Sequence, residues 1–132
     1  SDGRLLLKGT GATFDYSTDS NPSPLQNNVN IKSVIISEGV TSIGERLFQY
    51  CDNLKTVSLP TTLTAIKKAT FLPHIDGYIY HQSLNGLTEL KIPERVTELG
   101  VNAFAGTAIK SVTVPFSVTT VGAMTFSEVP VS

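Results

Sequence analysis

Three residues that could bind a metal ion lie close together in the chain: His74, Asp76 and His81. Imidazole nitrogens and carboxylate oxygens are ligands that zinc accepts. However, the spacing of these residues matches no familiar zinc motif, and a catalytic zinc site would also need a shaped cavity and supporting hydrogen bonds. We therefore predict that the chain holds no metal and no cofactor.

The same stretch also carries two of the four tyrosines, Tyr78 and Tyr80. Asp76-Gly77 is a turn signal, and the alternation that follows it predicts a protruding hairpin or ordered loop. Rigid aromatic rings with a polar tip suit contacts with a protein or a sugar. We take Tyr78, Tyr80, His81 and His74 as candidate partner-binding residues. The alternative is a tolerated surface insertion whose tyrosines cover the adjacent core.

The sequence offers no convincing set of catalytic residues. A nucleophilic thiol would need a histidine as its base, and neither histidine is in phase with the single cysteine, Cys51. A lone cysteine also excludes an intrachain disulfide and a cysteine-based metal cluster. We found no phosphate-binding glycine loop, nucleophile elbow or pair of carboxylates. We therefore predict a buried free thiol and no enzymatic activity.

The elements that must position all these residues come from a phrase that occurs four times. Apolar residues recur at offsets 0, 3, 5, 9, 12 and 17 of each copy, and the copies start 23, 33 and 22 residues apart. A period of 22 or 23 lies in the leucine-rich-repeat range, and each unit can bury its apolar face only against its neighbours. The copies read IKSVIISEGVTSIGERLF from Ile31, LKTVSLPTTLTAIKKATF from Leu54, LTELKIPERVTELGVNAF from Leu87 and IKSVTVPFSVTTVGAMTF from Ile109.

Each unit predicts two extended segments followed by a short turn. The first segment alternates inward and solvated residues, and a proline ends it in three of the copies. A second, β-branched segment follows, and after it glycines occupy one slot, where we expect a positive φ: Gly44, Gly100 and Gly122. The last piece predicts a helical turn that needs packing to form. The phenylalanines at offset 17 are expected to stack as an aromatic spine: Phe48, Phe71, Phe104 and Phe126.

The segment before the first copy lacks the phrase. Two apolar runs flank Gly9-Thr10-Gly11, which predicts a β-hairpin within residues 4–16. We expect it to cap the first repeat, with Leu25 and Val29 anchoring the loop that follows. The fold class predicted is α/β, rich in β: one structural domain built as a leucine-rich-repeat solenoid of about four repeats. Its parts are the cap and loop (1–30) and the repeats 31–53, 54–86 with the insertion 72–86, 87–108 and 109–132.

From about Arg4 to Phe126 the chain resembles the BspA-like leucine-rich repeats of bacterial surface proteins, whose phrase is LKxVxIPxxVTxIGxxAFxxC. Leu47, Thr70 and Thr125 depart from it at a slot that is usually alanine, and the insertion after Phe71 departs more strongly. The resemblance implies secreted or surface-anchored proteins associated with adhesion to host or matrix proteins and with contact between cells. It brings no catalytic motif. The implied location is therefore extracellular or at the cell surface.

The solvated face of the stacked first segments is a second candidate surface, because repeat scaffolds use such faces for extended partners. Ile35, Lys91 and Glu89 are its candidate partner-binding residues. The alternative is a plain solvated sheet face. The two columns predicted to point outward are Ser33, Thr56, Glu89 and Ser111, then Ile35, Ser58, Lys91 and Thr113.

Composition narrows the class of partner. A net charge of −1 and a pI near 6.1 give no basic footprint for nucleic acid, and no apolar run is long enough to insert into a membrane. The leading hypothesis is a noncatalytic protein-interaction or adhesion module of a bacterial cell-surface or secreted protein. The partner expected is a host or matrix protein, or a surface glycan. The alternatives are a carbohydrate- or cell-wall-binding accessory domain of a larger secreted protein and a structural spacer.

Overall fold

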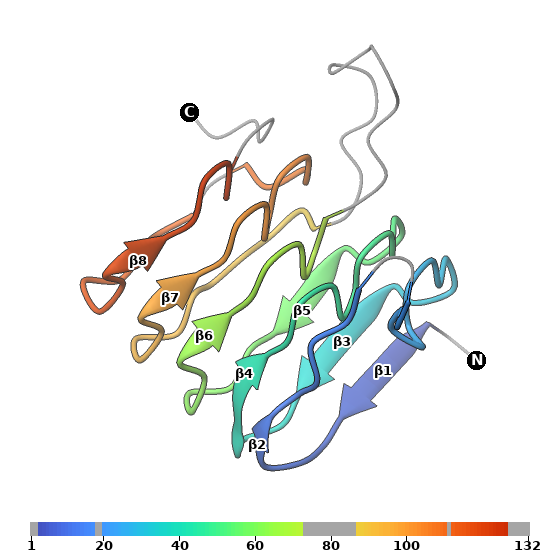
Figure 1. Ribbon diagram of the computed structural model, residues 1–132, viewed down its shortest axis with the longest axis horizontal. Helices are drawn as coiled ribbons and strands as arrows, with labels where there is room; N and C mark the ends of the chain where they lie inside the picture. Colours follow the sequence, from blue (N-terminus) through green and yellow to red (C-terminus); the bar gives the residue numbers. More distant parts are fainter. Residues whose placement is uncertain (1–2, 18–19, 73–86, 111, 127–132) are drawn as a thin grey trace.

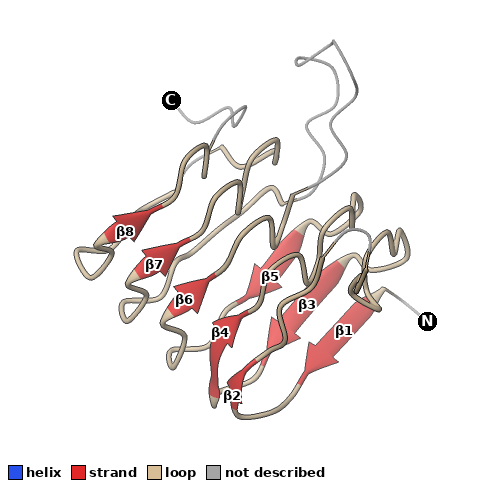
Figure 2. Cartoon of the chain, viewed as in Figure 1, coloured by secondary structure: helices blue, strands red, loops and turns tan. Residues whose placement is uncertain are grey.

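The computed structural model describes residues 3–17, 20–72, 87–110 and 112–126 of the chain. Within these residues the regular structure is entirely β, and every paired strand is parallel to its partner (Figures 1 and 2). The strands are β1 (Arg4–Leu7), β2 (Gly11–Ala12), β3 (Ser33–Ile36), β4 (Val40–Ile43), β5 (Thr56–Ser58), β6 (Ala65–Ile66), β7 (Glu98–Leu99) and β8 (Thr120–Val121). The prediction of a β-rich solenoid is confirmed.

Successive turns of the chain supply strands to two sheets. The first sheet has the order β1-β3-β5, and the second sheet has the order β2-β4-β6-β7-β8. Each of the first three units therefore contributes a strand to one sheet, bends, and then contributes a strand to the other, whereas the last two units contribute only β7 and β8 to the second sheet (Figure 1). The apolar residues of the repeat fill the space between the sheets and the turns, which is the core.

Alternation along β3 shows how the sequence sets the faces of the first sheet. Val34 and Ile36 are 1% and 2% exposed, whereas Ile35 between them is 54% exposed. Successive side chains of a strand point to opposite faces, so the apolar pair enters the core and Ile35 faces solvent. The predicted inward and outward residues of this segment are confirmed.

The bend between the two sheets is a hydrogen-bonded turn. The amide of Leu63 donates to the carbonyl of Pro60, and Val96 and Pro93 form the same pair in the next repeat, both at 3.2 Å. Proline suits this position because its carbonyl accepts while its ring nitrogen has no hydrogen to leave unpaired. The prediction that these prolines turn the chain is confirmed.

The helical turns predicted at the end of each unit do not form. The residue at offset 15 instead has a left-handed backbone in every repeat, with φ between 54° and 60°: Arg46, Ala69, Asn102 and Met124. A residue of this kind interrupts a right-handed helix. Their amides turn toward the next repeat in the first three units, where Arg46 donates to Lys68 and Ala69 to Val101, both at 2.9 Å. Thus the turns form a third set of hydrogen bonds between repeats.

The phenylalanine spine is present. Phe48, Phe71, Phe104 and Phe126 stack in order, with ring centroids 5.6 Å apart at each step and interplanar angles of 7° to 11°. The even spacing follows from the stacking of the repeats, because the same slot recurs at each turn of the solenoid. The prediction of an aromatic spine in the core is confirmed.

The reason why glycine recurs at offset 13 of the repeat differs from the one predicted. Gly44, Gly100 and Gly122 do not have the left-handed φ that was expected. Their backbones instead lie against the preceding unit, so that a Cβ on Gly44 would meet the carbonyl of Phe14 and one on Gly100 the backbone of Lys67. Close approach, not backbone conformation, therefore selects glycine.

The predicted N-terminal hairpin is wrong. A hairpin would pair β1 with β2, but β1 pairs in parallel with β3, and β2 in parallel with β4. The glycines that suggested a tight reversal instead let the chain pass from one sheet to the other, with Gly11 at φ 81°. The segment is thus an additional, partial unit of the solenoid. Leu25 packs against the core as predicted, whereas Val29 is 53% exposed and does not anchor the loop.

The first sheet stops earlier than predicted. Its pairing continues to the third repeat through one hydrogen bond, from the amide of Thr88 to the carbonyl of Lys55 at 3.0 Å. Within the described part of the chain, the backbones of Leu90, Lys91 and Ile92 form no hydrogen bond with another backbone group. The strands predicted for the first segments of the third and fourth repeats are therefore absent from the described residues. Ile92 still lies in the core, and Leu90 and Val112 pack against it.

Two of the residues assigned to the core by the repeat phrase are exposed. Val114 is 43% and Val121 is 55% exposed, and both belong to the fourth repeat. Within the described residues, no unit packs on the side of this repeat that faces away from the third. Since each unit buries its apolar surface only against its neighbours, the last described unit is covered on one side alone.

Candidate partner-binding face

The outward side of the first sheet forms the candidate surface. We call it the first-strand face: the outward residues of β1, β3 and β5, the lysines next to these strands (Lys8, Lys32 and Lys55), and the described exposed residues of 87–92 and 109–114. Ile35 lies in register with Leu6 on one side and Ser58 on the other. Leu6 is 52% exposed, so two branched apolar side chains stand next to each other in solvent. The sequence predicted Ile35 but missed Leu6, because β1 was assigned to a hairpin.

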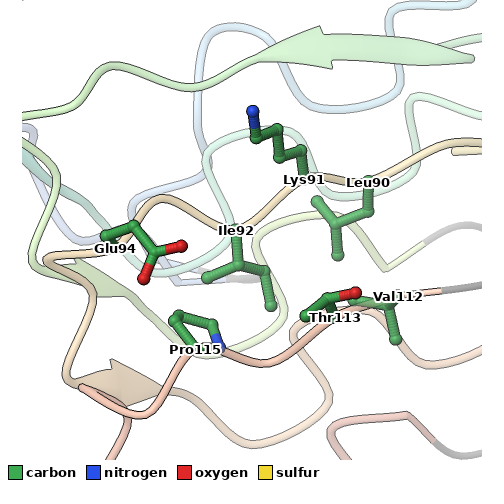
Figure 3. A pocket seen from close by; sticks show the side chains of 7 residues that line it. All are labelled: Leu90, Lys91, Ile92, Glu94, Val112, Thr113 and Pro115. Carbon is green, nitrogen blue, oxygen red and sulfur yellow. The ribbon is translucent and has the colours of Figure 1, made fainter.

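Lys91 and Glu89 are both exposed, as predicted, and lie where the first sheet stops. A pocket of about 310 Å³ is shared with β5 and is lined by Thr56, Val57, Glu89, Leu90 and Lys91. On the other side, a pocket of about 420 Å³ is lined by Leu90, Lys91, Ile92, Glu94, Val112, Thr113 and Pro115 (Figure 3). A hollow thus lies on each side of Lys91, at the place where the pairing of the first sheet stops.

A third pocket, of about 370 Å³, lies at the end of the same segment. Its apolar walls come from Leu59, Ile92 and Pro93, and its charged lining residues are Lys91, Arg95 and Glu94. Lys91 therefore lines all three hollows. The side chain of Lys91 points away from Ile92 and Pro115 in Figure 3, which leaves its ammonium group accessible.

Charge is unevenly divided between the two extended segments of the units. The second segments, residues 11–15, 40–46, 63–69, 96–102 and 118–124, balance three cations against three carboxylates. The first segments, residues 4–8, 31–37, 54–60, 87–93 and 109–115, carry one carboxylate, Glu89, and six cations: Arg4, Lys8, Lys32, Lys55, Lys91 and Lys110. The first-strand face is therefore basic in a chain whose net charge is −1.

The turn at the edge of this face holds one carboxylate in a fixed position. Glu38 accepts hydrogen bonds from the amide of Thr61 at 2.9 Å and from its hydroxyl at 2.8 Å. These bonds favour the charged form and lower the pKa of Glu38. Because both of its oxygens are already used by Thr61, Glu38 helps to fix the turn between two repeats.

Cys51 is a buried thiol, as predicted. Its side chain is 3% exposed, and its sulfur donates to the carbonyl of Leu25 at 3.1 Å. Burial is the main reason why the pKa of this thiol rises to about 11. A thiol with a raised pKa holds little thiolate near neutral pH, so Cys51 is unsuited to act as a nucleophile.

The remaining candidate residues lie outside the described part of the chain. These are His74, Tyr78, Tyr80 and His81, together with the insertion that carries them. Their role as binding residues stays a prediction. Among the residues that the structure does describe, no cluster of three metal-ligand side chains occurs.

Comparison with known proteins gives the family. The model of the BspA-type leucine-rich repeat region matches residues 21–131 in six copies. This match covers most of the chain, and the parallel sheets described above agree with it. The chain belongs to the BspA-type leucine-rich repeat family. No curated protein matches its sequence.

Solved bacterial leucine-rich repeat proteins share the fold. One from Bacteroides ovatus is 23% identical with a TM-score of 0.67 over 92% of this chain. The protein from T. pallidum is 20% identical with a TM-score of 0.68 over 95%, and one from Eubacterium ventriosum is 28% identical with a TM-score of 0.61 over 99%. This chain spans 30%, 59% and 40% of those three chains, respectively. The described residues include no helix that is long and apolar enough to cross a bilayer.

Proposed function

We propose that this protein is a noncatalytic protein-interaction module of a bacterial cell-surface or secreted protein, and that it acts in adhesion. The observation that carries the proposal is the first-strand face itself. Hydrogen bonds link successive repeats in the second sheet and along the turns, and the phenylalanine spine packs them together. A surface held in this way loses little conformational freedom when it binds, which favours affinity.

Family membership supports the location and the class of function. BspA-type repeats are generally associated with bacterial surfaces, and leucine-rich repeats commonly serve as interaction scaffolds. The high pKa of the buried Cys51 agrees with a noncatalytic role. The partner we expect is a host or matrix protein.

A binding survey tests this function. The whole chain is immobilised and exposed to a panel of purified matrix proteins and, separately, to a glycan array. The proposal expects saturable binding to at least one protein. Binding to no protein on the panel would contradict it, as would a reproducible enzymatic activity that is lost when named residues are replaced.

A carbohydrate-binding accessory role is the second candidate, and the tyrosines of the insertion favour it. Aromatic rings with a polar tip suit sugar faces as well as protein surfaces. Glycan-array hits that disappear with Tyr78→Ala and Tyr80→Ala would support this role. Hits that both variants retain would count against it. A version lacking residues 72–86, tested in parallel, separates the insertion from the first-strand face.

A further inference from the structure

We propose that the first-strand face binds an extended, acidic segment of a polypeptide partner. This inference rests on the proposed function and names the class of partner for the same surface. Three independent features of the described residues lead to it: lysines with no described ion pair, an exposed apolar pair and an interrupted sheet.

The described contacts of the lysines on this face include no carboxylate partner. The ion pairs resolved among the described residues, Arg46 with Glu45 at 3.3 Å and Lys67 with Glu98 at 3.4 Å, belong to the second segments. On the first-strand face, the ammonium group of Lys55 donates to a backbone carbonyl, that of Asp52, at 3.2 Å. The described contacts include no ion pair for the other lysines of the face, Lys8, Lys32, Lys91 and Lys110.

Three of these lysines recur at one slot of the repeat, directly after the first apolar residue: Lys32, Lys55 and Lys110. The amide of Lys55 donates to the carbonyl of Lys32 at 2.9 Å, so the first two occupy neighbouring rungs of the stack. Rungs of a sheet lie about 4.8 Å apart. Like charges at this distance repel one another, and a negatively charged ligand along the column relieves that repulsion.

The exposed pair of Leu6 and Ile35 favours a polypeptide over an acidic glycan. Both side chains are about half exposed and adjacent in register, and the neighbouring outward residues are small, Ser33 and Ser58. A polypeptide can place an apolar side chain on this pair and carboxylates on the flanking lysines. A sulfated or carboxylated glycan supplies the charges but has little apolar surface with which to cover the pair.

The interruption of the first sheet favours an extended partner. Leu90, Lys91 and Ile92 have backbone groups that pair with no other backbone in the described part of the chain, and hollows lie on both sides of them. Hollows that follow a strand-like segment suit an extended chain, whose alternate side chains can enter them. Repeats two and three are held at one strand spacing by β6 and β7, so the partner lies over this seam and is not inserted as a full strand.

A peptide titration tests the inference. The probe is a short, fluorescently labelled synthetic peptide in which glutamates alternate with serines and two leucines replace central serines. Its matched control has lysine in place of every glutamate. We expect the glutamate peptide to bind the whole chain saturably, more weakly as salt is raised, and the lysine peptide not to bind.

Paired variants locate the binding surface. Lys91→Gln with Lys110→Gln removes two charges from the first-strand face, and Lys67→Gln with Lys68→Gln removes two from the second segments. We expect the first pair to weaken peptide binding about five- to tenfold and the second pair to change it less than about twofold, since exposed ion pairs each contribute modestly. Ile35→Ser should weaken binding with no change in its salt dependence.

Four results would overturn the inference or reassign the face. Equal losses for the two lysine pairs, or binding of the lysine peptide, would overturn the inference. Heparin that binds at least as tightly as the glutamate peptide and competes with it would assign the face to an anionic glycan instead. If a matrix protein binds the chain but ignores Lys91→Gln with Lys110→Gln, the proposed function stands and this inference fails. Circular dichroism of each variant establishes that it is folded.

Discussion

At the scale of single residues, buried polar groups join the repeats at a slot that is usually alanine. The hydroxyl of Thr70 lies 3.1 Å from the carbonyl of Gly44 and 2.9 Å from that of Lys67, and Thr125 makes equivalent bonds two repeats later. Gly44 belongs to the preceding unit, so the bond crosses between repeats. The departure from alanine at Thr70 and Thr125 is therefore structural, a role that the repeat pattern alone does not reveal.

Replacing Thr70 by valine tests that role. Valine keeps the shape of the side chain but leaves buried carbonyls without their donor, so we expect the free energy of unfolding to fall by about 1–2 kcal/mol. Urea denaturation measures it. Thr64→Val is the control, because Thr64 also bonds to a carbonyl of the preceding repeat but is exposed to water. Equal losses at the two positions would contradict the explanation.

The thiol of Cys51 predicts a loss of stability at high pH. Burial raises its pKa from 9.0 to about 11 in the folded protein. Between these values the unfolded chain loses the proton while the folded chain keeps it, so stability is complete below pH 9 and falls as pH rises toward 11. The unfolding free energy of the wild type relative to Cys51→Ala should therefore decrease over this range. A constant difference would show that the thiol is not shielded.

At the scale of elements, close stacking of the units depends on the glycine slot. Gly100 lies against the backbone of the preceding repeat at Lys67, whereas Lys67, at the same slot one repeat earlier, carries a side chain without difficulty. We expect Gly100→Ala to destabilise the protein by about 1–3 kcal/mol, as overpacking does. Lys67→Ala loses only an exposed ion pair and should cost less than about 1 kcal/mol. Thermal unfolding of both variants checks this, and similar melting temperatures would refute it.

The interrupted first sheet makes a prediction for hydrogen exchange. The amides of β3 lie in a parallel ladder between β1 and β5, whereas those of Leu90, Lys91 and Ile92 have no backbone partner in the described chain. Exchange requires an amide free of its hydrogen bond, so Lys91 and Ile92 should exchange far faster than Val34 and Ile36. Similar protection at both places would mean that the first sheet continues into the third repeat.

The elements also show how far the sequence alone could lead. The apolar phase and the prolines predicted both extended segments and the bend between them, because burial and a missing amide act locally. The phase likewise placed the phenylalanine spine. The hairpin at Gly9-Thr10-Gly11 was wrong because strand pairing depends on partners that are distant in sequence, here β3 and β4. The prediction of helical turns was wrong because Arg46 and Ala69 have left-handed backbones, and residues of these types do not indicate that conformation in a sequence.

The candidate site was only partly predictable for the same reason. Alternation along β3 identified Ile35, and the repeat offsets placed Lys91 and Glu89 on the same face. The neighbouring Leu6 was missed because its strand was assigned to a hairpin, although the register places it beside Ile35. The hollows around Lys91 lie where the first sheet is interrupted. The repeat pattern is the same in all four copies, so it does not predict this interruption.

At the scale of the whole molecule, the two sheets differ in a way that suits different roles. The second sheet runs without interruption through β2, β4, β6, β7 and β8, and its segments are balanced in charge. The first sheet is interrupted, basic and partly apolar on its outward side. The continuous sheet holds the repeats together, and we propose that the interrupted one meets the partner.

The most direct test of that proposal is to map binding on the protein by amide chemical shifts. The whole chain, labelled with ¹⁵N, is titrated with the glutamate peptide and then with the lysine peptide. We predict that the glutamate peptide shifts amides of β1, β3 and β5 and of Leu90 to Ile92, and that the lysine peptide shifts none of them. Shifts confined to β4, β6, β7 and β8, or saturating binding that leaves the first-strand face unchanged, would contradict the account.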